Sequence, residues 1–186
     1  LDDNTVIIYT SDHGSHFRTR NNEYKRACHD ACIHVPMIAY GPGFTGGKVI
    51  SQLVSLIDLP ATLLKCGGID KPQTMQGRPL QQLVEGNTEN WPQEVFLQIS
   101  ESQVGRAIRT SKWKYSVRAF DKDGWVDEGS DCYQEEYLYD LEKDPHERNN
   151  LVKDPGYKAV RLELADILKK RMKEAGEKIP EIVNVK

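Results

Sequence analysis

Two consecutive side chains with metal-binding chemistry end an apolar stretch near the start of the sequence. Residues 5–14 read TVIIYTSDHG, and the β-branched run favours a buried strand of a parallel sheet, covered on both faces. Open α/β folds keep their sites at the carboxyl ends of such strands, so Asp12 and His13 are predicted metal ligands there, and Gly14 lets the chain turn away. The alternative is that Asp12 starts a turn or caps a helix and that His13 is a solvated surface residue.

A polar, basic segment follows these two residues. It spans residues 15–30, lacks apolar periodicity, and includes Arg18, Arg20, Lys25, Arg26 and His29. Long segments without regular structure in compact domains are usually functional or disordered. Positive charge directly after candidate metal ligands suits an anionic substrate, although the same charges are compatible with a solvated surface.

The remaining pattern up to residue 90 predicts strands and one helix. Residues 33–40 form a second apolar run, and Pro36 places its strand either after that proline or at a sheet edge. Residues 48–54 alternate loosely, as in a third short strand. Residues 58–68 indicate a helix with Asp58 as its N-cap, which makes a structural role the more natural one for that carboxylate.

The pattern changes beyond residue 90. Short strand-like runs follow one another closely, at residues 95–99, 106–110, 114–119 and 137–141. A helix with one apolar stripe is predicted for residues 156–176. The fold class is therefore α/β, in two domains. Residues 1–90 are predicted to form part of a mostly parallel sheet with flanking helices, and residues 91–186 a small antiparallel sheet of about four strands packed on the C-terminal helix.

Composition excludes several classes of partner. The 186 residues carry a formal net charge of −3, so no global field attracts nucleic acid or an anionic membrane. No apolar run approaches the roughly 18 residues that a membrane-spanning helix needs. The chain begins at Leu1 and reads like a piece of a longer protein, so the absence of a signal peptide leaves the compartment unknown.

The cysteines give a slight preference between compartments. Cys28, Cys32, Cys66 and Cys132 are scattered and do not resemble a disulfide scaffold, which slightly favours a reducing, cytoplasmic environment. The cluster of Cys28, His29, Cys32 and His34 lacks a second pair of ligands at zinc-site spacing. A structural zinc site is therefore not expected there.

Several motifs in order resemble the sulfatase family of the alkaline phosphatase superfamily. They are SDHG at residues 11–14, Lys25 ahead of the segment HVPMI, GPG at residues 41–43, VSLIDLPATLLKCGGI, MQGRPL, RAIRTSKWKYS and YLYDLEKDPHERNNL. The resemblance covers essentially the whole chain. It implies a sulfuric ester hydrolase of which this chain is the C-terminal portion, including the small C-terminal domain.

The resemblance also identifies what the chain lacks. Sulfatases carry a formylglycine nucleophile within a Cys/Ser-x-Pro-x-Arg motif in their N-terminal half, and this sequence contains no such motif. The N-terminal half of the same protein is thus an implied partner, and we expect the fragment to be inactive alone. The implied substrate is a small aryl or sugar sulfate. The sequence gives no information on the oligomeric state.

Carried over by position, the family's site falls on Asp12, His13 and Lys25, and two further histidines are candidates beside them. Asp12 and His13 match metal ligands, usually of Ca²⁺; the imidazole keeps Mn²⁺ and Zn²⁺ open. Lys25 matches the lysine that contacts the sulfate and the leaving oxygen. His29 is a candidate for substrate contact or acid–base catalysis, and His34 stands where the family commonly has Arg. Asp30 likewise replaces a common Glu.

Two rival functions remain open. One is a phosphoester or phosphonate-ester hydrolase of the same superfamily, which differs in a nucleophile segment that this chain does not contain. The other is a non-catalytic binding module, which would take up no metal at Asp12.

Overall fold

A computed structural model describes residues 2–185 of the 186-residue chain and divides it into two compact units. The first unit contains the residues up to Asp12 together with Val35–Gln93, and the second contains His13–His34 together with the residues from Glu94 onward. The predicted boundary near residue 90 lies close to the end of the first unit. Residues 13–34, which were predicted to belong to the first domain, group with the second unit.

The first unit is built on a two-stranded antiparallel sheet. Its elements are the 3-10 helix η1 (Asp2–Asn4), β1 (Ile7–Thr10), β2 (Met37–Tyr40), α2 (Asp58–Cys66) and α3 (Gln81–Val84). Ile8 of β1 lies opposite Ala39 of β2 in an antiparallel register, so the predicted parallel arrangement does not hold for this pair. Residues 48–54, predicted as a third strand, form none. There the Leu53 carbonyl accepts a hydrogen bond from the Trp91 indole N–H at 2.7 Å instead of from a neighbouring strand.

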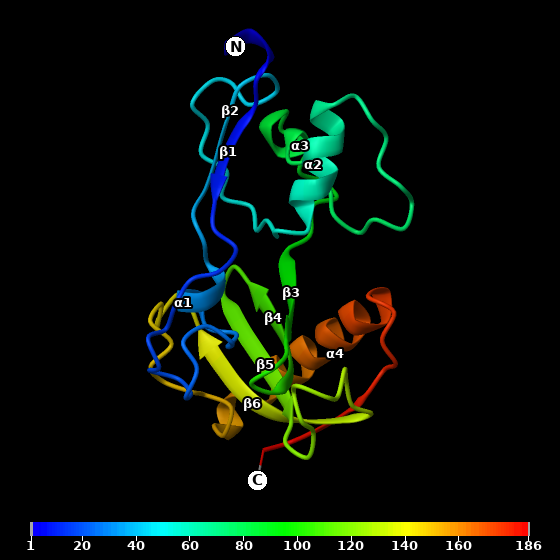
Figure 1. Ribbon diagram of the computed structural model, residues 1–186. Coiled ribbons are helices and arrows are strands. Elements are labelled where there is room, and N and C mark those ends of the chain that lie inside the picture. The colour runs from blue at the N-terminus through cyan, green and yellow to red at the C-terminus, as the bar shows by residue number, and fades with distance from the viewer. Residues whose placement is uncertain (1, 186) are drawn as a thin grey trace. The chain divides into compact units, whose positions relative to one another are not determined.

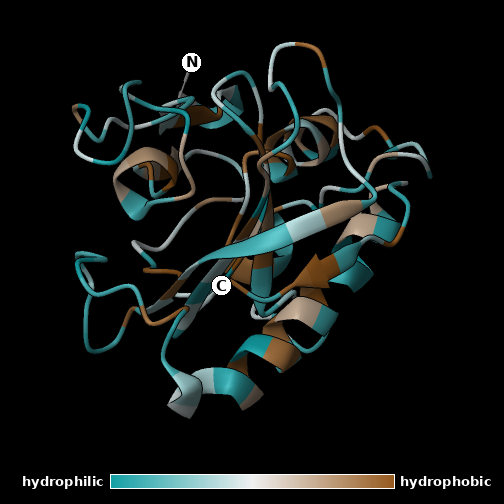
Figure 2. Ribbon diagram, turned by 90° about the horizontal axis from the view of Figure 1, so that it is seen from below, coloured by the Kyte–Doolittle hydropathy of each residue, from teal (hydrophilic) through white to brown (hydrophobic). Residues whose placement is uncertain are grey.

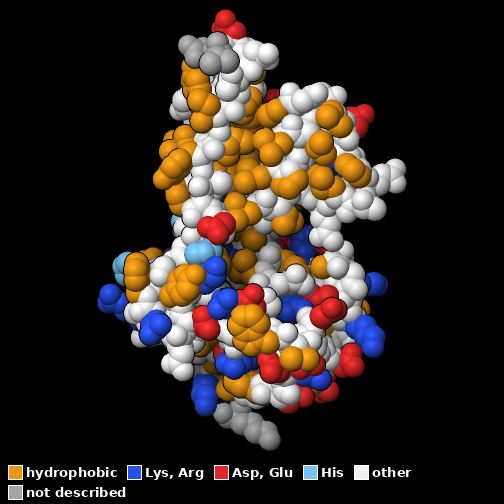
Figure 3. Space-filling view, viewed as in Figure 1, with side chains coloured by type: hydrophobic (Ala, Val, Ile, Leu, Met, Phe, Trp, Pro, Cys, Tyr) orange, Lys and Arg blue, Asp and Glu red, His pale blue; other side chains and the backbone are white. Residues whose placement is uncertain are grey.

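The two faces of the β1–β2 sheet differ in burial. One face packs into an apolar cluster that contains Met37, Ala39, Phe44 and Trp91. The other face carries four large apolar side chains that are 58–64% exposed: Ile7, Tyr9, Ile38 and Tyr40. Figure 3 shows hydrophobic side chains gathered over the unit that contains β1, β2 and α2. Among the described residues, the first strand is therefore covered on one face, whereas the sequence predicted cover on both.

Asp58 has a structural role, as predicted, but it is the first residue of α2 and not its N-cap, which is Ile57. Helix α2 begins at Asp58 itself, and the buried carboxylate accepts backbone N–H bonds from Ser55 at 2.8 Å and from Arg78 at 2.9 Å. Burial raises the pKa of this carboxyl, and the two N–H donors oppose that shift. Asp58 therefore ties two loop segments to the start of the helix.

The second unit contains a five-stranded sheet (Figure 1). Its strands, in spatial order, are β3 (Glu94–Ile99), β4 (Val104–Thr110), β5 (Trp113–Ala119), β6 (Cys132–Asp140) and β7 (Glu181–Val183). The strands β3 to β6 pair antiparallel in chain order, which confirms the predicted antiparallel sheet. The short strand β7 was not predicted, and it joins β6 in parallel.

The predicted C-terminal helix is confirmed as α4 (Lys158–Glu174), which packs on one face of this sheet. Hydrophobic and hydrophilic residues alternate along it (Figure 2), as a helix with one buried stripe requires. Leu164 and Leu168 of α4 pack with Ile108, Tyr115 and Leu138 of the sheet in the largest core cluster. Within residues 2–185, the structure contains no helix with the length and apolar character needed to cross a bilayer.

The opposite face of the sheet is covered by residues 13–34, which include α1 (Asp30–Ile33). Cys28 of this segment is buried in a small apolar cluster with Ile99 and Ala107 of the sheet. The register of β5 and β6 shifts between Ser116 and Val117, as at a β-bulge. The segment that carries most of the predicted site is thus held on a rigid sheet face.

Candidate functional site

His13 and Lys25 are brought together within the second unit. The Lys25 Nζ lies 3.0 Å from the His13 Nε2, although eleven intervening residues of mostly irregular chain separate them. The Gly14 carbonyl lies 2.8 Å from His13 Nδ1 and can only accept, so Nδ1 carries the hydrogen. The Nε2 lone pair therefore faces the Lys25 ammonium, which donates to it.

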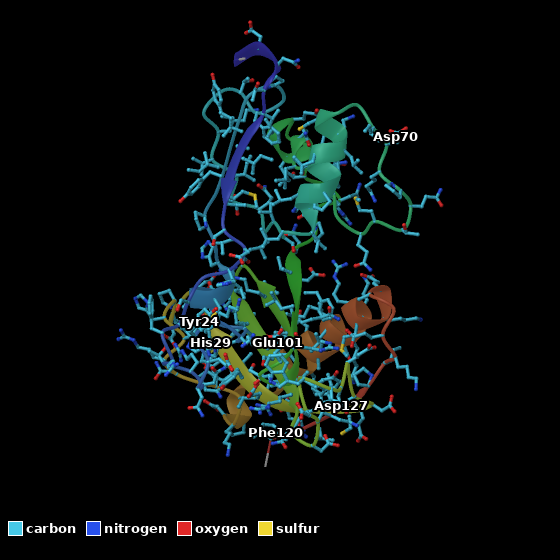
Figure 4. All side chains as sticks on the ribbon, viewed as in Figure 1. Tyr24, His29, Asp70, Glu101, Phe120 and Asp127 are labelled. Carbon is cyan, nitrogen blue, oxygen red and sulfur yellow. The ribbon has the colours of Figure 1, made fainter. Side chains whose placement is uncertain are left out.

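Tyr24 completes this cluster and was not predicted from the sequence. Its ring centroid lies 6.1 Å from that of His13 in an edge-on arrangement, and the Lys25 Nζ lies 5.5 Å from the same ring. The ring thereby restricts where both neighbours can move. The available signal was weak, since an aromatic residue next to a lysine is common on protein surfaces. Figure 4 labels Tyr24 and His29 on this segment.

Gly14 fixes the start of the segment by close packing. Its N–H donates to the Cys32 carbonyl at 2.7 Å, and a Cβ at this position would overlap the carbonyl oxygen of Ala31. The glycine was predicted to permit a sharp turn. The structure shows that it permits the backbone after His13 to lie against helix α1.

A buried network of charges anchors the same segment to the sheet. The Lys114 ammonium is completely buried and pairs with Asp30 and, at 2.6 Å, with Glu147. Arg109 donates to the Asp30 carboxylate at 3.0 Å, and the Arg20 guanidinium donates to the Glu147 carbonyl at 2.7 Å. Burial opposes ionisation of Asp30, but the hydrogen bonds and charges of Arg109 and Lys114 outweigh it and lower the pKa of Asp30.

His29 lies in the interior of the second unit. Its side chain is 1% exposed, and its Nε2 lies at hydrogen-bond distance, 3.2 Å, from the Tyr139 hydroxyl oxygen. Burial, reinforced by the charges of Arg20 and Lys114, lowers the pKa of His29 to about 3. A neutral, enclosed imidazole favours a packing role over the predicted contact with substrate.

His34 and Asp12 have different surroundings. The His34 side chain is 74% exposed and its Nδ1 lies 3.8 Å from a carboxylate oxygen of Asp30. It follows the last residue of α1 and does not join the cluster of His13, Tyr24 and Lys25 that hydrogen bonds and ring contacts define. Asp12 is exposed, belongs to the first unit and precedes His13 in the chain.

Asp12 and His13 carry donor atoms of the types that divalent cations accept. Asp12 offers carboxylate oxygens and His13 offers the Nε2 lone pair, which are a hard and a softer ligand. In the part of the chain that the structure describes, no group of three or more His, Cys, Asp and Glu side chains is arranged to hold a metal ion. Divalent cations take four or more ligands, so these two side chains require further donors.

Comparison with known proteins identifies the family. Residues 22–174 match the family model described as N-sulphoglucosamine sulphohydrolase, C-terminal. Arylsulfatase K of Homo sapiens is 31% identical over 157 residues, which are 79% of this chain and 27% of that protein. The chain thus spans about a quarter of the length of the curated relative it matches.

Three solved structures superpose on most of this chain. A 2-O GAG sulfatase superposes with a TM-score of 0.75 at 26% identity, covering 92% of this chain and 37% of that one. A structure in complex with its substrate, D-glucosamine-2-N,6-O-disulfate, gives 0.72 at 25% identity, with 94% and 35% covered. The phosphonate monoester hydrolase of Agrobacterium radiobacter gives 0.71 at 26% identity, with 91% and 35% covered. With the family match extending across both units, this chain belongs to the sulfatase family, as part of its C-terminal portion.

Proposed function

We propose that the polypeptide that carries this chain hydrolyses sulfate esters of sugar or aryl alcohols, and that this chain supplies Lys25 together with Asp12 and His13. The observation that carries the proposal is the 3.0 Å approach of the Lys25 Nζ to the His13 Nε2. It joins an ammonium, suited to an anionic group, to an imidazole next to a carboxylate in the chain. The sulfated glucosamine bound by one structural relative and the name of arylsulfatase K support the substrate class.

Lys25 is proposed to bind the sulfate and to stabilise its departure. The half-buried ammonium has three N–H donors, of which one is directed at His13, so others remain for sulfate oxygens and the bridging oxygen. Negative charge develops on that bridging oxygen as the S–O bond breaks. A fixed cation beside it lowers the barrier.

Asp12 and His13 are proposed to hold a divalent cation; the carboxylate favours Ca²⁺, and the imidazole suits Mn²⁺ or Zn²⁺. When bound, such an ion polarises a sulfate oxygen as a Lewis acid. The residues of this chain provide the fixed ligands. Gly14 holds the His13 backbone against α1, and the Nδ1 hydrogen bond to the Gly14 carbonyl orients the imidazole ring.

The nucleophile is proposed to come from the rest of the polypeptide as a formylglycine. No Cys/Ser-x-Pro-x-Arg sequence occurs in this chain, and the chain spans 27% of arylsulfatase K. We further propose that the rest of the polypeptide covers the exposed apolar face of β1 and β2, because four large apolar side chains there lie 58–64% exposed. On this view the chain alone does not turn over substrate.

The test is an assay of the full polypeptide on matched aryl sulfate and aryl phosphate, for the wild type and for Lys25→Met. Lys178→Met is the control, because Lys178 is an exposed lysine of the same unit. We expect the full polypeptide to prefer the sulfate. Lys25→Met is expected to lose turnover, whereas Lys178→Met is expected to retain the wild-type rate. An undiminished rate in Lys25→Met contradicts the proposal.

A second candidate is hydrolysis of phosphonate or phosphate esters. The structural similarity to the phosphonate monoester hydrolase of Agrobacterium radiobacter, which is as close in identity as that to the GAG sulfatase, favours it. The same pair of substrates decides between the two candidates. A strong preference for phosphate, or for phenyl phosphonate added as a third substrate, would replace the sulfatase proposal with this one.

A further inference from the structure

The second unit contains a polar cleft whose residues have no part in the proposed site. It has a volume of about 740 Å³ and lies among residues 21–23, the connection between β3 and β4 at residues 101–103, and residues 118–125. Glu101 and Phe120, from two of these segments, are labelled in Figure 4. The volume is of the size that small-molecule sites have in proteins.

Two exposed aromatic rings line this cleft. Phe120 is 57% exposed and Trp125 is 69% exposed, which is unusual for side chains that normally gain stability by burial. A guanidinium forms a cation–π contact with each ring. The Cζ of Arg118 lies 4.8 Å from the Phe120 ring centroid, and the Cζ of Arg26 lies 5.3 Å from the Trp125 ring centroid. These contacts restrict the rings, so flat apolar surfaces are held in place beside polar groups.

Carboxylates outnumber cations among the lining residues. The lining includes Glu23, Glu101, Asp121 and Asp123, against Arg118 and Lys122. The cations already have carboxylate partners: Lys122 lies 3.8 Å from Asp127, and Arg118 lies 3.5 Å from Glu136. The nearby Arg26 pairs with Glu23 at 2.7 Å and also with Glu101. Because Arg26, Arg118 and Lys122 are each paired with a carboxylate, the cleft offers an anionic ligand little uncompensated positive charge and favours a neutral one.

The walls of the cleft are held in place by the backbone. The Glu101 N–H donates to the Gly124 carbonyl at 2.8 Å, and the Ser102 hydroxyl donates to the Arg26 carbonyl at 2.9 Å. Gly124 approaches so closely that a Cβ there would lie 2.7 Å from the Gln103 nitrogen. Because the three segments are joined in this way, the cleft exists before any ligand binds, which reduces the entropic cost of binding.

We propose that this cleft binds an uncharged pyranose unit of a saccharide. A pyranose with equatorial substituents has an apolar C–H face that stacks on an aromatic ring, and hydroxyl groups that donate to carboxylates. Phe120 and Trp125 provide the rings, and Glu101 and Asp123 are among the acceptors. The inference does not depend on the proposed hydrolysis, because it concerns unsulfated sugar and is tested by binding alone.

The test is calorimetric titration of the full polypeptide with cellobiose, lactose and N,N′-diacetylchitobiose, each up to about 20 mM. We expect at least one of them to bind, and Trp125→Ala to weaken its affinity at least tenfold, a change of about 1.4 kcal/mol at 25 °C. Trp125→Phe keeps a ring and is expected to retain most of the affinity. The control Phe17→Ala removes an exposed aromatic side chain of the same unit outside the cleft and is expected to change nothing.

Two results would overturn the inference. One is that none of the three disaccharides binds in a way that Trp125→Ala weakens. The other is that 6-O-sulfated diacetylchitobiose binds through Trp125 while the unsulfated sugar does not, since the cleft would then recognise an anion. Thermal melting of each variant separates loss of binding from loss of folding. If the full polypeptide binds the sugar but shows no sulfatase activity, the proposed function is wrong and this inference still holds.

Discussion

The Nε2 lone pair of His13 faces the Nζ of Lys25 at 3.0 Å, so the nitrogen that is proposed to bind a metal ion already accepts a hydrogen bond from an ammonium. A metal ion and the Lys25 ammonium would repel each other if both approached the imidazole. A site that uses both must let Lys25 turn toward the substrate when a metal binds. The Tyr24 ring, 5.5 Å from the Nζ, limits the directions that remain open to this side chain.

This geometry predicts opposite effects of Lys25→Met on metal binding and on turnover. Removal of the ammonium takes a positive charge away from the metal, so the affinity of the full polypeptide for Ca²⁺ or Mn²⁺ is expected to rise by about tenfold or more. Turnover is expected to fall by about 10²- to 10³-fold, the usual cost of losing one group that stabilises developing charge. Calorimetry and initial rates measure the two effects. A lysine with only a surface role would change neither, as expected for Lys178→Met.

The second prediction concerns Gly14. Gly14→Ala places a methyl group against the carbonyl oxygen of Ala31, a backbone atom that cannot rotate away. Overpacking of this kind costs about 1–3 kcal/mol, so we expect a loss of that size in the free energy of unfolding. The matched control is Gly129→Ala, where the nearest atom to the new Cβ is a side-chain nitrogen at 3.6 Å. Urea denaturation of both variants is the measurement, and equal stabilities would contradict the packing argument.

Gly14 also shows how far the sequence determines the site. The string SDHG predicted that the chain bends there, but the reason for the glycine is the closeness of α1, which lies in a later part of the chain. Local patterns carried enough information for α4, because its apolar stripe recurs within a few turns. Strand β7 spans three residues and depends on pairing with β6, so no pattern of its own predicts it.

The buried ion network of Lys114, Asp30 and Glu147 likewise could not be predicted from local sequence patterns. Strand alternation places Lys114 on one face of β5, but the sequence does not say that residues 13–34 cover this face and bury the ammonium. The resemblance to sulfatases assigned His13 to a metal ion and Lys25 to the sulfate, and only the irregular segment between them determines that they meet. Contacts made by irregular segments depend on the tertiary fold as a whole.

The third prediction therefore concerns Lys114. Lys114→Met leaves the carboxylates of Asp30 and Glu147 without their buried cation, and we expect a loss of about 3–5 kcal/mol in the free energy of unfolding. Lys112→Met is the control, because Lys112 forms a surface pair with Glu142 at 3.3 Å and its loss should cost less than about 1 kcal/mol. Equal losses in the two variants, measured by urea denaturation, would show that the buried network does not anchor the segment.

The last prediction follows from the buried imidazole of His29. Its pKa is lowered to about 3 in the folded protein, whereas an unfolded histidine titrates near 6.5. The unfolded state therefore binds a proton first as the pH falls. The contribution of His29 to stability is complete above about pH 6.5 and is lost on acidification toward about pH 3, at up to about 1.4 kcal/mol per pH unit.

His29→Gln tests this directly, because an amide can still form a hydrogen bond with the Tyr139 hydroxyl but does not titrate. Urea denaturation at pH 7, 6 and 5 should show a stability difference between wild type and variant that shifts steadily in favour of the variant as the pH falls. Carboxylates titrate in both proteins and cancel in this difference. A constant difference for His29→Gln across this range would mean that the imidazole is accessible to protons, and a direct contact between His29 and substrate would again be the better account.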